Sequence, residues 1–428
     1  MTANADLVER SGDLKRELVD YAQQPRFDDA FRQAIEQRFD GAEPIVDEDE
    51  IANFLDWMIL EVRLPDGRTV VEHFVADHPE LTEEERTMLL GWLEVVEGIF
   101  EVERRDGAAL IVVNLVDDLT YRVRSNMGTA VFAQMPRQSF FVGRIVPIAD
   151  EWLLSGTTSL LPAASRDDVY RMAVEFSAQF PAMVFRNPEK LKLAWEMQRE
   201  ERRHFVDFFG ADLVVVPGRE VAARMQAYMR YRTFEARNAE GKTVAELAKE
   251  AYGAVPPEIP YPTPSEFAAE ETVGIIYDEV DGLSFYTDFG VVEETFANPA
   301  LASDRRHRQA VLGYLEDSSI TPLPFWRLAD RDPERASQVF RRVLKQPSFT
   351  WERDGEALLR QHKASDSEKP VLPSVMPVST RLARVTMTPP KRDRATPNVQ
   401  PARDHPKPDF QPTRRRKKGS WKSRGWRR

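Results

Sequence analysis

The chain has 428 residues, of which 42% are hydrophobic and 10% aromatic, so it can bury more than one apolar core, and its formal net charge is −11. Cysteine is absent, which excludes disulfides, thiolate-bound zinc, iron–sulfur clusters and a cysteine nucleophile. The first twenty residues are charged and the apolar runs are short, so we expect a cytoplasmic protein without a secretory signal or a membrane span.

Residues 1–98 are predicted to be mainly helical. Leu14 and Leu18 lie four residues apart within an amphipathic pattern, and a second such pattern follows before residue 40. Thr82 is followed three residues later by Glu85, the spacing of a capping box, which predicts that a helix begins there.

Residues 99–161 change to a strand-like pattern. Asp106-Gly107 is a typical hairpin turn between the first two strands. The predicted strands are Ile99–Glu103, Ala109–Asn114, Thr120–Val123, Ser139–Pro147 and Glu151–Ser155. Short strands at this density predict a small antiparallel sheet or a partly closed barrel, and an OB-type barrel is one of the alternatives.

Residues 162–255 are predicted to be helical again. One helix is expected to begin at Asn187-Pro188-Glu189 and to end at Gly210, because asparagine and proline favour helix starts and glycine favours helix ends. Residues 256–269 are predicted to be a linker, since five of the nine residues 256–264 are proline.

Residues 270–363 are predicted to form a second small α+β unit. A strand is expected at Val273–Tyr277, followed by a turn at Asp281-Gly282 and by three helical segments. Residues 364–428 contain many prolines and few apolar side chains, so we expect a disordered basic tail. The predicted fold class of the whole chain is α+β.

One resemblance covers roughly the first half of the chain. The matching segments are Phe54-Leu55-Asp56-Trp57-Met58, Leu64-Pro65-Asp66-Gly67-Arg68-Thr69, Glu72-His73-Phe74, Gly143-Arg144-Ile145-Val146-Pro147 and Phe208-Phe209-Gly210. They resemble uncharacterised bacterial proteins grouped with the SEC-C-motif proteins, which carry a cysteine-rich zinc module near one end. This chain has no cysteine, so the resemblance implies shared ancestry without the zinc module.

Two Glu/Asp–His pairs have a spacing that could suit metal ligands. Glu201 and His204 lie three residues apart on a predicted helix, as do Asp304 and His307. The spacing resembles that of carboxylate-bridged metal bundles, but ion pairing with the neighbouring arginines on solvated helix faces explains both pairs more simply. Phosphate-binding glycine motifs are absent from the sequence, and we predict neither a cofactor nor a bound metal.

Carboxylates gather at residues 278–288. Asp278, Glu279, Asp281 and Asp288 could act as acid and base in a hydrolase or hold a divalent cation, and an ordinary Asp-Gly turn is the alternative. A further aromatic set is expected to pack in the core of the second unit rather than to form a ligand cage. This aromatic set is Phe325, Trp326, Phe340, Phe349 and Trp351.

The C-terminal tail carries the opposite charge to the rest of the chain. Residues 370–428 contain 16 Lys and Arg against 3 Asp and Glu, a net charge of +13, whereas residues 1–369 have a net charge of −24. Such asymmetry predicts a basic arm that binds polyanions. The candidate nucleic-acid-binding residues are Arg414, Arg415, Arg416, Lys417, Lys418, Trp421, Lys422, Arg424, Trp426, Arg427 and Arg428.

Basic side chains neutralise phosphates, and the two tryptophans can stack on unpaired bases, so the leading hypothesis is a non-enzymatic protein whose arm binds nucleic acid, RNA more than DNA. One alternative is a carboxylate-based hydrolase or metal-dependent enzyme that uses the 278–288 cluster. Another is an adaptor whose tail binds an acidic protein partner or its own acidic body. A membrane partner is not expected, because the tail has no lipidation site and no amphipathic helix.

Overall fold

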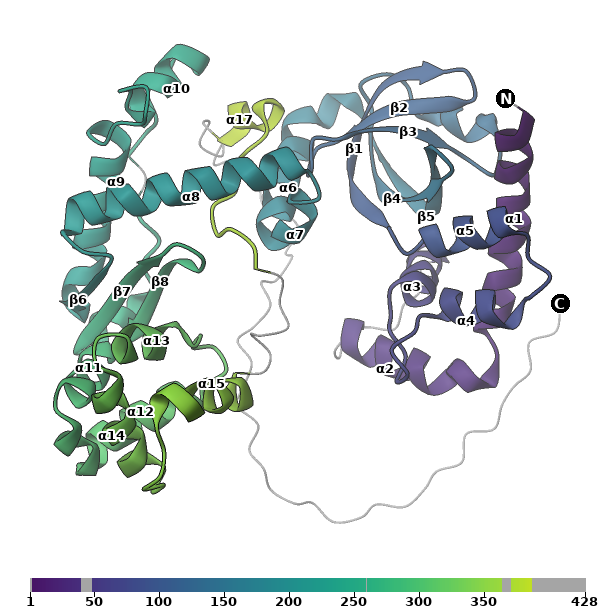
Figure 1. The fold of residues 1–428 in the computed structure, drawn as a ribbon. Coiled ribbons are helices and arrows are strands. Elements are labelled where there is room, and N and C mark those ends of the chain that lie inside the picture. Colours follow the sequence, from purple (N-terminus) through teal and green to yellow (C-terminus); the bar gives the residue numbers. More distant parts are fainter. Residues whose placement is uncertain (1, 40–47, 259, 364–370, 387–428) are drawn as a thin grey trace, which may run out of the picture. The chain divides into compact units, whose positions relative to one another are not determined.

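The computed structural model describes residues 2–39, 48–258, 260–363 and 371–386 (Figure 1). The chain divides into a unit of residues 1–388 and a second unit of residues 389–428, and the second lies outside the described residues. The first unit combines helices with two β-sheets, so the predicted α+β fold class is confirmed. None of the helices in this described part could span a bilayer.

A helical layer precedes the first strand. Its helices within the described residues are α1 (Thr2–Ala22), α2 (Asp28–Phe39), α3 (Glu48–Leu60), α4 (Val70–Asp77) and α5 (Glu83–Gly91). Their apolar faces bury Leu14, Leu18 and Phe74 in one cluster that also contains Val146 and Leu153 of the following sheet. The layer and the sheet therefore share a core.

The following sheet is a closed five-stranded barrel. Its strands are β1 (Val96–Asp106), β2 (Ala109–Asn114), β3 (Thr120–Arg124), β4 (Phe140–Ile148) and β5 (Glu151–Leu161). The order is β1-β2-β3-β5-β4, in which β1 pairs antiparallel with β2 and β4 while β3 and β5 run parallel. This is the strand arrangement of an OB-type barrel. All five predicted strands are confirmed, but the sheet is mixed and not purely antiparallel, because β3 and β5 run parallel, and the barrel is closed and not only partly closed.

The interior of the barrel is closely packed. Phe100 stacks on Phe141 with ring centroids 4.8 Å apart. Gly98 on β1 pairs with Gly143 on β4, and a Cβ atom at Gly98 would overlap the side-chain amide of Asn114. Any larger side chain at position 98 must therefore displace Asn114 from the β2–β3 turn.

Helices α6 (Arg166–Gln179), α7 (Pro181–Val184) and α8 (Pro188–Phe209) follow the barrel. Helix α6 covers the outer face of the barrel, where Val169 and Tyr170 pack with Ile99 and Phe140. In α8, Lys190 donates a hydrogen bond to the carbonyl of Val116 in the β2–β3 turn. The start of α8 is thereby attached to the barrel.

Helix boundaries follow the predicted caps. The side chain of Thr82 accepts a hydrogen bond from the backbone N–H of Glu85, whose carboxylate accepts one from the backbone of Thr82. Asn187 caps the start of α8 through its side chain, and Gly210 ends the helix at φ +80°. Only residues without a Cβ atom adopt this left-handed conformation without strain.

A second sheet has the order β6-β7-β8, with strands β6 (Leu213–Pro217), β7 (Thr272–Asp278) and β8 (Gly282–Thr287). Strand β6 lies in the region predicted to be helical, before the proline-rich segment, and pairs with β7 beyond it. Strands β6 and β7 are separated in the sequence by α9 (Val221–Phe234) and α10 (Val244–Tyr252). Strand β8 is followed in the sequence by α11 (Phe289–Ala297), α12 (Arg305–Glu316), α13 (Leu323–Ala329), α14 (Pro333–Val343) and α15 (Trp351–His362). Segments on both sides of the proline-rich linker therefore form one sheet.

The aromatic set in this second part forms its core, as predicted. Phe325, Phe340, Phe349 and Trp351 are buried in one cluster, and Phe340 stacks on Trp351 at 5.3 Å between ring centroids. Trp326 contacts Trp351 edge-on but remains 36% exposed.

The prediction of disorder throughout residues 364–428 is wrong for residues 371–386. Leu372 and Met376 pack against the cluster of Val116 and Val184, and α17 (Thr380–Thr386) packs on α6. These apolar side chains are too sparse to show a helical pattern, but each meets a buried surface formed elsewhere in the fold. Residues 364–370 and 387–428 lie outside the described residues.

We predict that Gly98→Ala lowers the free energy of unfolding by about 1–3 kcal/mol, because the added methyl group overlaps Asn114 in a closely packed barrel. Gly91→Ala is the control, since its added Cβ would meet only Pro147, at 4.0 Å, and should change stability by less than about 0.5 kcal/mol. Urea unfolding measures both. Equal effects of the two substitutions would contradict the overlap.

Candidate functional site

The structure positions the chain that leads into the predicted basic arm. The candidate residues from Arg414 to Arg428 lie outside the described residues. The last described helix, α17, precedes them by fewer than thirty residues of sequence. The contacts of α17 therefore show where the chain leaves the described structure before the arm begins.

Helix α17 is fastened to the barrel by charge and by apolar contact. Arg381 donates hydrogen bonds to Glu101 at 3.1 Å and to Glu103 at 2.6 Å, both on β1. Burial opposes ionisation of Arg381, but its bonds to the two carboxylates outweigh this effect and raise its pKa. Leu382 and Val385 are buried with Ile99 and Val169. The helix that precedes the basic arm is thus bound to acidic groups of the chain itself.

Glu101 is the centre of this attachment. Its carboxylate also accepts hydrogen bonds from Arg166 at 2.9 Å and from the Tyr170 hydroxyl at 3.1 Å, both on α6. Side chains of β1, α6 and α17 therefore meet at one buried carboxylate. Burial and this carboxylate raise the pKa of Tyr170.

A shallow cavity of about 440 Å³ adjoins α17. Arg104, Arg137 and Arg381 line it together with Glu101 and Glu103. The cavity is therefore lined both by α17, the helix that precedes the arm, and by arginines of the barrel.

Strand β3 presents arginines on the outer side of the barrel. Arg122 and Arg124 alternate with the buried Tyr121 and Val123, so the two guanidinium groups lie on the outward face. In OB-type barrels the outer face of strands 2–3 and the adjoining loops bind oligonucleotides. Arg104 on β1 shares the carboxylate of Asp106 with Arg122, and we call Arg104, Arg122 and Arg124 the arginine face.

Two carboxylates hold the arginine face in place. Arg122 donates to Glu151 at 2.5 Å and pairs with Asp106 in the β1–β2 turn, while Arg124 pairs with the same Glu151. Burial opposes ionisation of Glu151, but the arginines outweigh it and lower the pKa of this carboxyl. The aromatic residues nearest in sequence, Tyr121 and Trp152, pack edge-on against one another with centroids 5.0 Å apart, and Tyr121 belongs to the barrel core. The arginine face therefore carries three arginines against two carboxylates, and Tyr121 and Trp152 are engaged in packing with one another.

Asp278 and Asp288, at the two ends of the 278–288 cluster, do not converge. Asp278 pairs with Gly282 at the β7–β8 turn, where its side chain accepts from the backbone of Val280 and lies 3.3 Å from Arg327. Asp288 follows the opposite end of β8. The length of a strand separates the two groups, so they do not form one acid–base pair.

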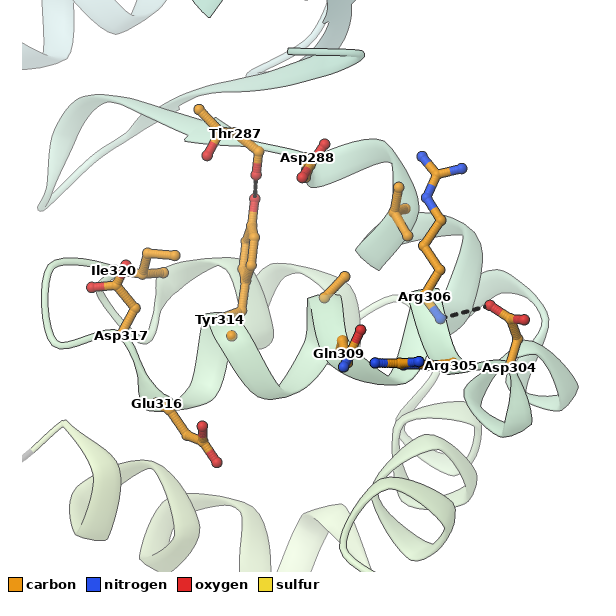
Figure 2. Close-up of a pocket in the computed structure, with 13 residues that line it drawn as sticks. Thr287, Asp288, Asp304, Arg305, Arg306, Gln309, Tyr314, Glu316, Asp317 and Ile320 are labelled. Carbon is orange, nitrogen blue, oxygen red and sulfur yellow. Dashed lines mark hydrogen bonds between the residues drawn. The ribbon is translucent and has the colours of Figure 1, made fainter. Parts of the chain in front are cut away.

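Asp288 instead lines an open cavity of about 910 Å³ along α12 (Figure 2). Asp304 lies at the start of α12 and Glu316 at its end, as Figure 2 shows. The Tyr314 hydroxyl donates to the carbonyl of Thr287, and burial raises the pKa of Tyr314, so the hydroxyl stays protonated. The lining residues do not include a paired nucleophile and base.

The two Glu/Asp–His pairs have local partners. Glu201 bonds to Arg232, and His204 is buried beside Arg203. Asp304 caps α12 and accepts from the His307 ring at 3.0 Å, which lowers its pKa. In the part of the chain that the structure describes, no group of three or more His, Asp or Glu side chains could hold a metal.

The structure contains a buried charge network that the sequence did not predict. The Asp56 carboxylate on α3 accepts from Arg144 on β4 at 2.9 Å and from Ser155 on β5 at 2.7 Å, and it pairs with Lys15 on α1. The Asp56 side chain is 2% exposed and that of Arg144 5%. The available signal was a charged residue inside an apolar run, Phe54–Leu60 for Asp56.

The electrostatic balance of this network favours charge. Burial opposes ionisation of Asp56, but Lys15 and Arg144 outweigh it, so the pKa of Asp56 is lowered. Arg144 further contacts Glu61 and, at 3.5 Å, Glu97. Arg144 is thus saturated by carboxylates from α3, β1 and the loop after α3.

Comparison with known proteins gives one match. Residues 9–208 match a family described as "Family of unknown function (DUF7986)", a stretch that runs from α1 to α8 and includes the whole barrel and the buried charge network. No curated protein and no solved structure matches the chain. The resemblance to SEC-C-motif proteins stays a prediction.

We predict that Asp56→Asn destabilises the protein by about 3–5 kcal/mol, because Lys15 and Arg144 lose a buried counter-charge. The folded-state pKa of Asp56 lies below the unfolded value of about 4, so its contribution is complete above that pH and is lost as the pH falls through the lowered pKa. Urea unfolding at neutral and acid pH measures this difference.

Glu97→Gln is the matched control for the same arginine. Glu97 is partly exposed and lies at 3.5 Å from Arg144, so its loss should cost less than about 1 kcal/mol. If Asp56→Asn and Glu97→Gln destabilised equally, the buried pair would not be the dominant contact.

Proposed function

We propose that the protein is a non-enzymatic nucleic-acid-binding protein that holds single-stranded RNA with its basic C-terminal arm, residues 387–428. The observation that carries the proposal is the attachment of α17, through Arg381, Leu382 and Val385, to an OB-type barrel with an outward arginine face. The arm is thereby connected to a fold class that binds oligonucleotides in other proteins.

Charge supports the proposal. Residues 387–428 contain 14 Lys and Arg against 3 Asp and Glu. Neutralising phosphates releases counterions, so such a segment binds nucleic acid strongly at low salt and weakly at high salt. The acidic remainder of the chain repels phosphate, which restricts binding to the arm and the arginine face.

Aromatic placement favours RNA with unpaired bases over duplex DNA. Trp421 and Trp426 lie among the basic residues of the arm. Stacking on these rings needs bases that are not paired in a duplex, as in RNA loops and single strands. Tyr121 and Trp152 of β3 and β5 are engaged with the barrel core and with one another, so stacking is assigned to the arm.

A second candidate function is an adaptor whose arm binds acidic protein surfaces. The specific observation in its favour is that Arg381 already pairs with Glu101 and Glu103 of the same chain. Asp278 and Asp288 lie at opposite ends of β8, which speaks against a carboxylate-based enzyme that uses both of them.

We predict that deletion of residues 411–428 weakens binding of a single-stranded RNA oligonucleotide at least about tenfold. The slope of log affinity against log salt is negative, and the deletion should make it less negative by about 0.7 for each phosphate that the deleted residues neutralise. Filter binding over a range of salt concentrations measures both quantities. Unchanged affinity and slope after the deletion would refute the proposal.

The double variant Trp421→Ala and Trp426→Ala separates stacking from charge. It should weaken binding by about 1–3 kcal/mol per stacked base while leaving the salt slope unchanged. An arm that binds acidic protein instead predicts salt-sensitive self-association of the full chain without nucleic acid, measured by light scattering, and no effect of the deletion on RNA.

A further inference from the structure

We propose that a cavity between the N-terminal helices and the barrel binds a neutral, apolar small molecule that carries one hydrogen-bond acceptor, such as an aromatic ketone. Its lining residues all lie between Lys15 and Thr157 in the sequence. It lies within the stretch that matches the family of unknown function.

The cavity has the size and lining of a small-molecule site. Its volume is about 320 Å³, and such sites in proteins measure about 300–1,000 Å³. Val19 of α1, Leu55 of α3, Val146 of β4 and Leu153 of β5 contribute apolar surface. Because four elements meet here, the shape of the cavity depends on how the helical layer is held against the barrel.

Three polar residues of the lining are joined in one cluster, and Asn126 and Thr157 line the cavity as well. Lys15, Asp56 and Ser155 all line the cavity and bond to one another: Lys15 to Asp56, Lys15 to Ser155 at 3.2 Å, and Ser155 to Asp56 at 2.7 Å. An apolar cavity with a few fixed polar groups is the usual composition of a ligand site, in which the polar groups orient the ligand.

Lys15 provides a donor for the ligand. An ammonium group has three N–H donors, and within the described residues Lys15 donates to Asp56 and Ser155. Its Nζ lies 5.2 Å from the ring centroid of Trp92, which also lines the cavity. The third donor is available to an acceptor on a ligand that packs beside this ring.

The charge of the surroundings selects a neutral ligand. The network around the cavity contains Asp56, Glu61 and Glu97 against Lys15 and Arg144, one carboxylate in excess. An anionic ligand would add to this excess, and a cationic ligand would meet the Lys15 ammonium beside Asp56, whose carboxylate is already paired with Lys15 and Arg144.

Met127 provides an exposed apolar surface at the cavity that a bound ligand could cover. Its side chain lines the cavity and is 69% exposed, the largest exposure among the big apolar side chains of the described residues. Methionine is flexible and polarizable, and it adapts to apolar ligands of varied shape.

The test uses prodan, a neutral fluorescent aromatic ketone whose emission shifts to the blue in apolar surroundings, titrated with the full-length protein. We expect saturable, blue-shifted emission. Ala52→Phe fills the cavity from α3 and should weaken prodan binding at least about tenfold. Ile51→Phe adds a ring at the adjacent exposed position, outside the lining, and should change affinity less than about twofold.

Two further measurements keep the test decisive. Met127→Glu alters an exposed side chain, so the fold is retained, and its charge at the cavity should weaken prodan several-fold. Acetophenone should displace prodan at a lower concentration than ethylbenzene, which lacks the acceptor, and this difference should vanish in Lys15→Met. Absence of saturable binding, equal binding by the Ala52→Phe and Ile51→Phe variants, or equal displacement by the two competitors overturns the proposal.

Discussion

The ion pair between Asp56 and Arg144 joins the helical layer to the barrel, and the rest of the N-terminal structure depends on it. A buried carboxylate is stable only when its counter-charges and hydrogen bonds are complete. Here Arg144, Lys15 and Ser155 complete them from β4, α1 and β5. Neither α1 nor α3 can move against the barrel without leaving a charge unpaired. The same requirement maintains the cavity between these elements.

Carboxylates of the barrel have a second organising role at its outer face. Glu101 gathers Arg166, Tyr170 and Arg381, so one acidic side chain holds α6 and α17 on β1. Glu151 holds two arginines of β3 in a similar way. Acidic groups of the body thus position arginines instead of only repelling polyanions, which reconciles a body of net negative charge with a proposed nucleic-acid function.

The two proposals assign different ligands to different parts of the chain. The arm combines positive charge with two tryptophans, a composition that suits a long polyanion with unpaired bases. The cavity has apolar walls and a lysine donor, which suit a small neutral molecule. The cavity is lined by barrel strands, and the arm follows a helix that packs on the barrel. The part built around β6–β8 contributes an aromatic core and an open cavity without a paired nucleophile and base.

The sequence by itself determined the features that depend on neighbours in the chain: the cap at Thr82, the end of α8 at Gly210, the five barrel strands and the charge of the arm. Caps, turns and alternation act over a few residues, so they can be read locally. Only the tertiary structure decided the pairing of β6 with β7, the docking of α17 and the contact of Asp56 with Arg144, 88 residues apart. Those contacts form between segments distant in the chain, and their energy depends on surfaces that exist only after folding.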